Sequence, residues 1–338
     1  MTLGPLMLDV EGTVLSALER ERIAHPGWVA SSCLPAISRI RIRCDVDCRD
    51  ARGAAGVDRG SGSGRRPGAA GEEGRDPVAA AGPTGAVVDE NPVQAMQGAR
   101  EWGWLMATEM LALGFDISFA PVLDLNVGRS RVIGDRAFHG TPQAVVALAR
   151  SYIAGMHEAG MAATGKHFPG HGWVEADSHH AIPVDERSEA DIRAQDLQTF
   201  AQLARDLDAV MPAHVIYQQV DAQPAGFSRY WLQQVLRSEL RFEGVIFSDD
   251  LTMEGASVAG GYGERAAAAL AAGCDMVLVC NNPAGAQTVL DYLDQHPASV
   301  DQARLQRMLA RRRQDLATLM ASDRYQTIQT DMQARSLT

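Results

Sequence analysis

Two stretches of the chain hold the residue types that could do chemistry. Residues 166–172 read Lys-His-Phe-Pro-Gly-His-Gly and are followed by Asp-Ser-His-His at 177–180, while residues 244–250 read Gly-Val-Ile-Phe-Ser-Asp-Asp. The first stretch gathers a cation, several imidazoles and a carboxylate after an apolar run. Such groups are costly to bury without partners, so we expect them to line a polar cleft. The second stretch places carboxylates at the end of an apolar strand. Together the two stretches favour acid/base chemistry combined with a nucleophile.

The elements that must position these residues alternate along the chain. Short apolar runs alternate with amphipathic stretches, and this alternation is typical of a parallel sheet with crossover helices. The expected strands are 5–10, 115–120, 160–165, 208–211, 244–247 and 275–280. The expected helices are 101–113, 143–159, 189–205, 231–240, 264–272, 283–294 and 300–319. The polar residues that follow the strands include Asp124, Lys166, His167, His214, Asp249, Asn281 and Asn282. In a parallel barrel the strand ends share one face, where the active site is built.

One long segment departs from this pattern. An eight-stranded barrel needs two more strands between Val10 and Glu101. Residues 27–87 form instead an anomalous segment rich in glycine, alanine and arginine, and residues 50–85 contain no Leu, Ile, Phe, Tyr or Trp. Such a composition predicts a loop or disorder. We therefore predict one α/β domain over residues 1–338, a (β/α)8 TIM-type barrel in which strands 2 and 3 are missing or disrupted.

Composition excludes several classes of function. The formal net charge of −11 and the pI near 5.3 argue against a nucleic-acid-binding protein. The chain has no run of 18 or more apolar residues, and its first ten residues lack the features of a secretion signal, so we expect no membrane partner. Five cysteines at irregular spacing are typical of a reducing cytoplasm, where we place the protein. Cys44 and Cys48 have no matching second pair, which argues against a zinc site.

Four motifs resemble one known family. Lys-His-Phe-Pro-Gly-His-Gly at 166–172, Asp-Ser-His at 177–179, Ile-Gly-Asp-Arg-Ala-Phe at 133–138 and Phe-Ser-Asp-Asp-Leu-Thr-Met-Glu-Gly at 247–255 are similar to those of the bacterial β-N-acetylhexosaminidases of glycoside hydrolase family 3. The resemblance covers residues 1 to about 23 and 88 to about 316. It implies a (β/α)8 barrel and a retaining exo-β-N-acetylglucosaminidase. Such an enzyme removes N-acetylglucosamine from peptidoglycan-derived muropeptides through a covalent glycosyl-enzyme. The resemblance also implies a cytoplasmic monomer with a small carbohydrate substrate and no cofactor or metal.

The resemblance assigns the catalytic roles. Taken alone, an aspartate at the end of a strand such as Asp249 more often caps the next helix, but the full family motif implies that it is the nucleophile. His179 becomes the general acid/base, for which imidazole is suited because its ordinary pKa of about 6.5 lies near working pH. Asp177 would hold one ring nitrogen of that histidine, as an aspartate does in other dyads. His180 competes for the acid/base role, and only the Asp-Ser-His spacing of the family selects His179.

The remaining polar residues receive binding or structural roles. Lys166 and His167 match the family's substrate-binding pair, and Arg136 matches an arginine that contacts substrate, although a lone arginine often forms an ordinary surface ion pair. Glu175 and His171 are interpreted as structural, because residues 169–172 have the composition of a tight turn. Asp250 is interpreted as a structural neighbour of Asp249, and His214 as a further residue of the cleft.

The anomalous segment lacks a motif that the family carries. That motif is Ala-Val-Asp-Gln-Glu-Gly-Gly-Arg-Val, whose Asp holds sugar hydroxyls, whereas residues 60–68 read Gly-Ser-Gly-Ser-Gly-Arg-Arg-Pro-Gly. One permitted set of codons for 60–68 is GGC AGT GGA TCA GGA AGG CGG CCG GGT. Read one base later, these codons give the family motif. We therefore hypothesise that residues 27–87 are an out-of-frame translation of a barrel section; the alternative is a divergent insertion.

Two other functions remain open. A metal-dependent hydrolase would use His167, His171, His179 and Asp177 as ligands, since first-row metals bind such sets of nitrogen and oxygen atoms. However, the two histidines of the first motif lie in a Pro/Gly turn and not on a helix, so their rings need not face one site. The third hypothesis is a catalytically impaired product of a frameshifted gene, because an interrupted barrel exposes strand edges.

Overall fold

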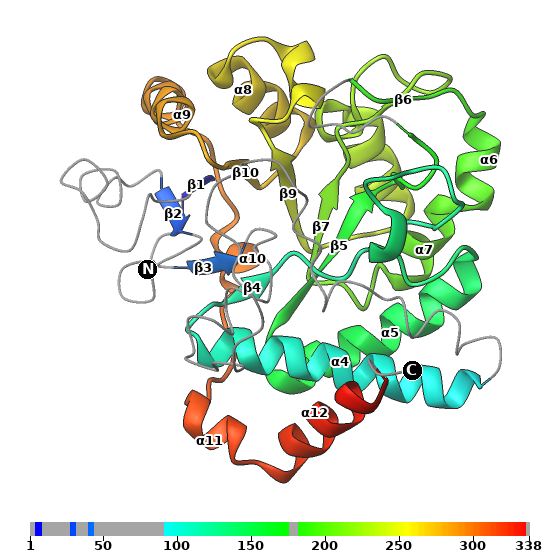
Figure 1. Cartoon of the computed structure of the whole chain (residues 1–338). Coiled ribbons are helices and arrows are strands. Elements are labelled where there is room, and N and C mark those ends of the chain that lie inside the picture. Colours follow the sequence, from blue (N-terminus) through cyan, green and yellow to red (C-terminus); the bar gives the residue numbers. More distant parts are fainter. Residues whose placement is uncertain (1–3, 9–27, 32–39, 44–90, 176–181, 336–338) are drawn as a thin grey trace, which may run out of the picture.

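The protein folds as a closed parallel barrel, and helices pack around its β4, β5, β7, β9 and β10 strands (Figure 1). The computed structural model describes residues 4–8, 28–31, 40–43, 91–175 and 182–335. Within these residues, the barrel strands follow the order β1-β10-β9-β7-β5-β4-β3-β2. Their bounds are β1 Leu6–Leu8, β2 Trp28–Ser31, β3 Ile40–Arg43, β4 Ile117–Ser118, β5 Ala162–Phe168, β7 Ala209–Pro212, β9 Val245–Asp250 and β10 Met276–Val279. The six strands expected from the sequence are therefore confirmed, as is the (β/α)8 barrel.

The prediction that strands 2 and 3 are missing or disrupted is wrong in its first part, because both are present as short strands. β2 pairs with β1, and β3 pairs with β2 and with β4, all in parallel, so these two strands complete the ring. The prediction rests on the average composition of the segment, whereas the run without Leu, Ile, Phe, Tyr or Trp begins only after Ile42. The apolar residues of both strands precede this run and include valine or isoleucine, which favour extended backbone. The rest of 27–87 lies outside the described residues.

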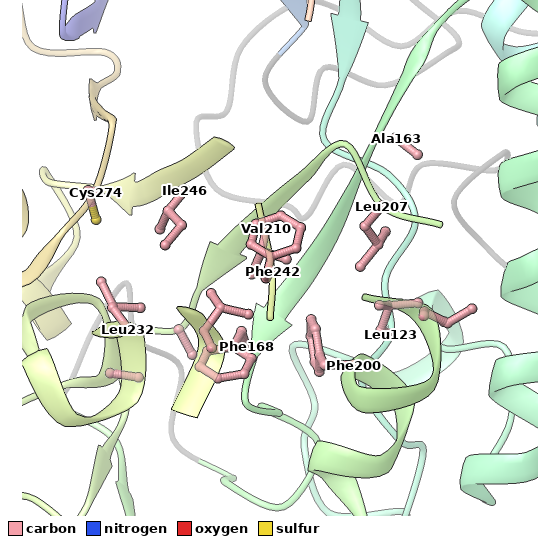
Figure 2. Packing of buried hydrophobic residues seen from close by; sticks show 14 of the residues in the cluster. Leu123, Ala163, Phe168, Phe200, Leu207, Val210, Leu232, Phe242, Ile246 and Cys274 are labelled. Carbon is pink, nitrogen blue, oxygen red and sulfur yellow. The ribbon is translucent and has the colours of Figure 1, made fainter. Parts of the chain in front are cut away.

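The side chains of each strand point alternately into and out of the barrel, and this divides the core into two clusters. Met211, Phe247 and Leu278 belong to a cluster inside the barrel, where Phe247 meets Phe119 edge to face with ring centroids 5.2 Å apart. Val210 and Ile246, one position away, belong to the larger cluster between the strands and the helices, part of which is shown in Figure 2. Successive side chains on a strand point to opposite faces, so buried strands of this kind are apolar on both sides.

Helices cover the outside of the barrel. The main ones are α4 Pro92–Ala112, α5 Pro142–Ala159, α6 Glu189–Ala194, α7 Asp196–Leu203, α8 Tyr262–Ala272, α9 Pro283–Gln295, α10 Gln302–Gln306, α11 Leu316–Met320 and α12 Asp323–Arg335. The remaining helical segments are the 3-10 helices η1 Gly134–Arg136, η2 Ala225–Phe227 and η4 Glu254–Ala259 and the π-helix η3 Tyr230–Glu239. α4 and α5 pack closely because Gly103 and Gly155 lie against backbone of the facing helix, where a Cβ would come within 2.1 Å or less of a carbonyl oxygen. Among the described residues, none of the helices has the length and apolar character needed to cross a membrane.

Some helix boundaries differ from the prediction. α4 begins at Pro92 and not near 101, because the Asn91 side chain accepts a hydrogen bond from the backbone N–H of Gln94 and starts the helix earlier. The expected helix 300–319 is two short helices, α10 and α11. Between them Arg313 donates hydrogen bonds to Asp116 and to the carbonyl of Phe115 at the start of β4. This stretch of chain therefore makes contacts to the barrel in place of the backbone hydrogen bonds of a continuous helix.

Candidate active site

Three of the predicted site residues lie at one end of the barrel. Lys166 and His167 are near the carboxyl end of β5, and Asp249 is near the carboxyl end of β9. β7 lies between these strands and pairs with both, with Lys166 opposite Met211 and Val210 opposite Ile246. Because all three strands are parallel, their carboxyl ends meet at the same barrel mouth. The barrel thus brings together residues more than 80 positions apart in the chain.

Buried groups hold the β5 side of the site. Lys166 and His167 are only 2% and 7% exposed, and the peptide bond between them is cis. The Nδ1 atom of His167 lies 2.7 Å from an oxygen of Asp124, which is itself 1% exposed and follows β4. The same carboxylate accepts hydrogen bonds from the backbone N–H groups of His167 and His171. Asp124 therefore fixes both the ring of His167 and the turn that follows β5.

The electrostatics of Asp124 agree with this role. Burial raises the pKa of its carboxyl, but the charge and hydrogen bond of His167 and the contacts of His171 outweigh burial, so the pKa lies below its usual range. Sequence reasoning noted Asp124 only as a polar residue after a strand. The signal that could have revealed its role is its place between Leu123 and Leu125, since a charged residue between buried leucines must find buried partners.

The two neighbouring aspartates of β9 have different surroundings. Asp250 accepts hydrogen bonds from the backbone and hydroxyl of Thr252 and from the backbone N–H of Cys280, and burial raises the pKa of its carboxyl despite these contacts. Asp249 is partly exposed, and one of its oxygens accepts the backbone N–H of Asp250 at 2.9 Å. Asp250 is thus held by its neighbours, as the sequence interpretation expected, while Asp249 lies on the same face of β9 as Phe247, which points into the barrel.

Two buried histidines complete this end of the barrel. His171 and His214 are 2% and 0% exposed, and the ring nitrogens of both lack a hydrogen-bond partner among the described residues. Burial lowers the pKa of both imidazoles, while the charge of Asp249 acts in the opposite direction on each. His214 follows the carboxyl end of β7, where the sequence analysis expected a residue of the cleft. His171 was interpreted as structural, yet its ring approaches His167 with centroids 5.9 Å apart.

Of the remaining predicted residues, Arg136 belongs to a short helical segment, and the others fall outside the described residues. Arg136 ends η1, in the connection between β4 and α5, and its Nη1 donates to the carbonyl of Val132 at 3.3 Å. Asp177, His179 and His180 fall in 176–181, outside the described residues. Two of the four ligands of the metal hypothesis are therefore among them. Within the described residues, no group of three or more His, Cys, Asp or Glu side chains is placed to hold a metal ion.

A closed parallel barrel with a carboxylate, a lysine and a histidine at the carboxyl ends of its strands defines an enzyme of the TIM-barrel class. Residues 84–311 match the family model "Glycosyl hydrolase family 3 N terminal domain". The chain is 49% identical over 339 residues to a β-hexosaminidase of Tolumonas auensis, and the match covers 98% of each chain. The protein therefore belongs to glycosyl hydrolase family 3 and is a glycoside hydrolase, which confirms the resemblance found in the sequence.

Solved structures support the same assignment. Native NagZ from Neisseria gonorrhoeae is similar with a TM-score of 0.80 and 36% identity, covering 98% of this chain and 97% of that one. NagZ of the same organism in complex with N-trifluoroacetyl-D-glucosamine gives a TM-score of 0.79 at 36% identity, with the same coverage. The similarity therefore extends over nearly the whole length of both chains.

Proposed function

We propose that this glycoside hydrolase is a retaining exo-β-N-acetylglucosaminidase that releases N-acetylglucosamine from peptidoglycan-derived muropeptides in the cytoplasm, as a monomer. The observation that carries the proposal is the partly exposed Asp249 carboxylate at the carboxyl end of β9, beside the buried Lys166 and His167. The β-hexosaminidase name of the Tolumonas auensis relative supports the activity. The glucosamine derivative in the complex with the Neisseria gonorrhoeae protein supports the sugar.

The chemistry follows a double displacement. His179, oriented by Asp177, protonates the oxygen of the leaving group while Asp249 attacks the anomeric carbon. The result is a covalent glycosyl-enzyme. His179, now unprotonated, then takes a proton from water, which attacks the anomeric carbon and releases the sugar with its original anomeric configuration. Two displacements at one carbon account for retention.

The β5 side of the mouth serves to hold the sugar. Lys166 and His167 would donate hydrogen bonds to its hydroxyl groups, and Arg136 would supply a further contact. Because Nδ1 of His167 is engaged by Asp124, the atom of that ring that would meet the sugar is Nε2. Buried donors that are already fixed lose little conformational freedom when the substrate binds, so the arrangement favours tight and specific binding.

The proposal is tested by substrate selectivity and stereochemistry. We expect the protein to cleave an aryl N-acetyl-β-D-glucosaminide and to leave the matching aryl β-D-glucoside intact. We also expect proton NMR, recorded before mutarotation, to show the β-anomer of N-acetylglucosamine as the first product. Cleavage of both aryl substrates at similar rates would overturn the sugar assignment, and the α-anomer as first product would overturn the retaining mechanism.

A further inference from the structure

Two short stems of chain enclose residues 176–181, the stretch in which Asp177 and His179 lie. The first stem is 170–173 and the second is 183–187, and both are described in full. We propose that Arg187 is a positioning residue for the glycosidase reaction: it ties the two stems together and so sets where His179 reaches the substrate. The inference rests on the proposed function in one respect, which is that His179 acts as the general acid/base.

Arg187 is bound firmly to the second stem. Its guanidinium makes a two-pronged ion pair with Asp185, with Nε and Nη2 within 3.1 Å of the carboxylate oxygens, and its backbone N–H donates to the same carboxylate. Asp185 is fully buried and belongs to β6 Val184–Asp185, which pairs in parallel with β8 Ile216–Tyr217. The paired geometry restricts the arginine to one orientation, because a guanidinium and a carboxylate match along two parallel hydrogen bonds.

The same guanidinium reaches the first stem in two ways. Its carbon lies 4.7 Å from the centroid of the Trp173 ring, which is also met by the Arg129 guanidinium carbon at 4.3 Å. Its Nη1 donates to Asp196 at 2.7 Å, and Asp196 packs against Gly170 so closely that a Cβ on that glycine would come within 2.5 Å of the carboxylate. The first stem is therefore held through one aromatic face and one buried carboxylate.

The second stem and the first also share β8. The Tyr217 hydroxyl donates to the carbonyl of Gly170 at 2.8 Å, while the strand that carries Tyr217 pairs with β6. Arg187 and Tyr217 are thus two independent ties between the stems. Of the two, only Arg187 is a charged group, and its side chain is 8% exposed while Asp185 and Asp196 are 0% and 3% exposed.

The charges of this cluster make Arg187 difficult to replace. Burial lowers the pKa of its guanidinium, but the hydrogen bonds and charges of Asp185 and Asp196 outweigh burial and raise it, so the group stays charged at every pH of interest. A lysine could satisfy one carboxylate but has no planar group to pair with Asp185, meet Asp196 and lie over Trp173 at the same time. The conservative variant Arg187→Lys therefore keeps a buried positive charge while it releases the tie between the stems.

The chemistry of the leaving group provides the test. Proton donation by His179 matters for a poor leaving group such as phenoxide and not for 2,4-dinitrophenoxide, which departs without a proton. A misplaced His179 should therefore slow the phenyl substrate much more than the dinitrophenyl substrate.

The experiment compares kcat/KM, which reports the glycosylation step, for phenyl and 2,4-dinitrophenyl N-acetyl-β-D-glucosaminides. The variants are Arg187→Lys and Trp173→Leu, and the second of these leaves both buried carboxylates paired with Arg187. For Arg187→Lys we expect a loss of about 10- to 100-fold with the phenyl substrate, the effect of misplacing a reacting group by up to an ångström. We expect less than about 3-fold loss with the dinitrophenyl substrate, and the same pattern at smaller size for Trp173→Leu.

Two controls distinguish a positioning role of Arg187 from a general effect on folding. Arg193→Lys alters an arginine that pairs with Glu189, Glu239 and Tyr230, none of which belongs to either stem, and it should affect both substrates alike. Adding Arg187→Lys to His179→Gln should cause no further loss with the phenyl substrate, because the arginine acts through that histidine. Equal losses with both substrates, or multiplied losses in the double variant, would overturn the inference. If His179→Gln itself showed no preference for the better leaving group, the result would contradict the proposed acid/base role of His179 and not the role of Arg187 in joining the two stems.

Discussion

The two sides of the barrel mouth hold their charged groups in opposite ways. On the β4–β5 side, Asp124, Lys166 and His167 are nearly inaccessible, and the aspartate connects to the histidine through side-chain and backbone hydrogen bonds. On the β9 side, Asp249 is partly exposed and accepts one backbone hydrogen bond, while its neighbour Asp250 takes the structural contacts. The comparison supports the proposed roles, because side chains that are to bind a sugar benefit from being fixed in advance, whereas a carboxylate that is to react with the sugar must remain accessible.

The largest expected effect separates Asp249 from Asp250. We expect Asp249→Ala to lower kcat by about 10⁴-fold or more, the scale seen when a nucleophile is removed, with little change in melting temperature. Asp250→Ala should instead destabilise the fold by about 1–3 kcal/mol, because the donors of Thr252 and Cys280 lose a partly buried acceptor. Steady-state kinetics and thermal unfolding of both variants check this. Near-normal turnover by Asp249→Ala would contradict the proposed difference in role between Asp249 and Asp250.

The second effect concerns the anomalous segment. A gene in which the frame of residues 27–87 is restored should encode an enzyme with a kcat/KM about 10- to 100-fold higher, the value of one or two hydrogen bonds from sugar hydroxyls to a charged group. We also expect better solubility, because residues 50–85 contain no Leu, Ile, Phe, Tyr or Trp that could pack against the barrel, whereas a restored barrel section would supply such residues. Activity assays and soluble yield of the two proteins provide the measurement. Equal rates and equal melting temperatures would support a divergent insertion instead.

A third effect tests the fixed binding side. Asp124→Asn places an amide where several N–H donors converge, so it should raise KM by about tenfold and lower stability by about 1–3 kcal/mol. Asp116→Asn is the matched control, since Asp116 is also buried but pairs with Arg313 at the other end of the barrel. The control should lose stability without a change in KM. If both variants changed KM alike, binding would depend on the fold in general and not on Asp124.

The smallest effect is a pH dependence of stability. Burial raises the pKa of Asp208, but the hydrogen bonds from His157 and from the backbone of Ala163 and the charge of Arg311 outweigh burial and lower it. Because the folded pKa lies below the unfolded value of about 3.9, the stabilisation is complete above that pH and is lost as pH falls toward the folded pKa. Asp208→Asn should therefore cost about 1–3 kcal/mol at pH 7 and show a weaker fall of unfolding free energy below about pH 4. Urea unfolding across pH measures both, and an unchanged slope would contradict the prediction.

The sequence predicted the barrel and its reacting face because both depend on simple periodic features. Apolar runs such as 244–247 end in polar residues, and parallel strands bring those ends together, so the shared location of Lys166, His167 and Asp249 followed directly. Other features could not be predicted in this way. β2 and β3 were missed because average composition concealed two short stretches of extended chain, and the helix predicted at 300–319 was divided by contacts to the distant Asp116.

The roles of the site residues were less accessible than their positions. The hydrogen bonds of Asp124 join residues 43 and 47 positions apart, so no local pattern revealed them. The difference between Asp249 and Asp250 depends on Thr252 and Cys280, of which the second belongs to the region after β10. The proposal that Asp249 is the nucleophile therefore comes from the family motif and not from the physics of the sequence.

The central claim is that Asp249 becomes covalently attached to the sugar. The direct measurement is mass spectrometry of the His179→Gln variant, quenched during reaction with 2,4-dinitrophenyl N-acetyl-β-D-glucosaminide. This substrate does not need the acid, while the slow second step lets the intermediate accumulate. We predict a mass increase of one N-acetylglucosaminyl group, located on the peptide that contains Asp249. An adduct on any other residue, or hydrolysis of the substrate with no adduct at all, would contradict the account.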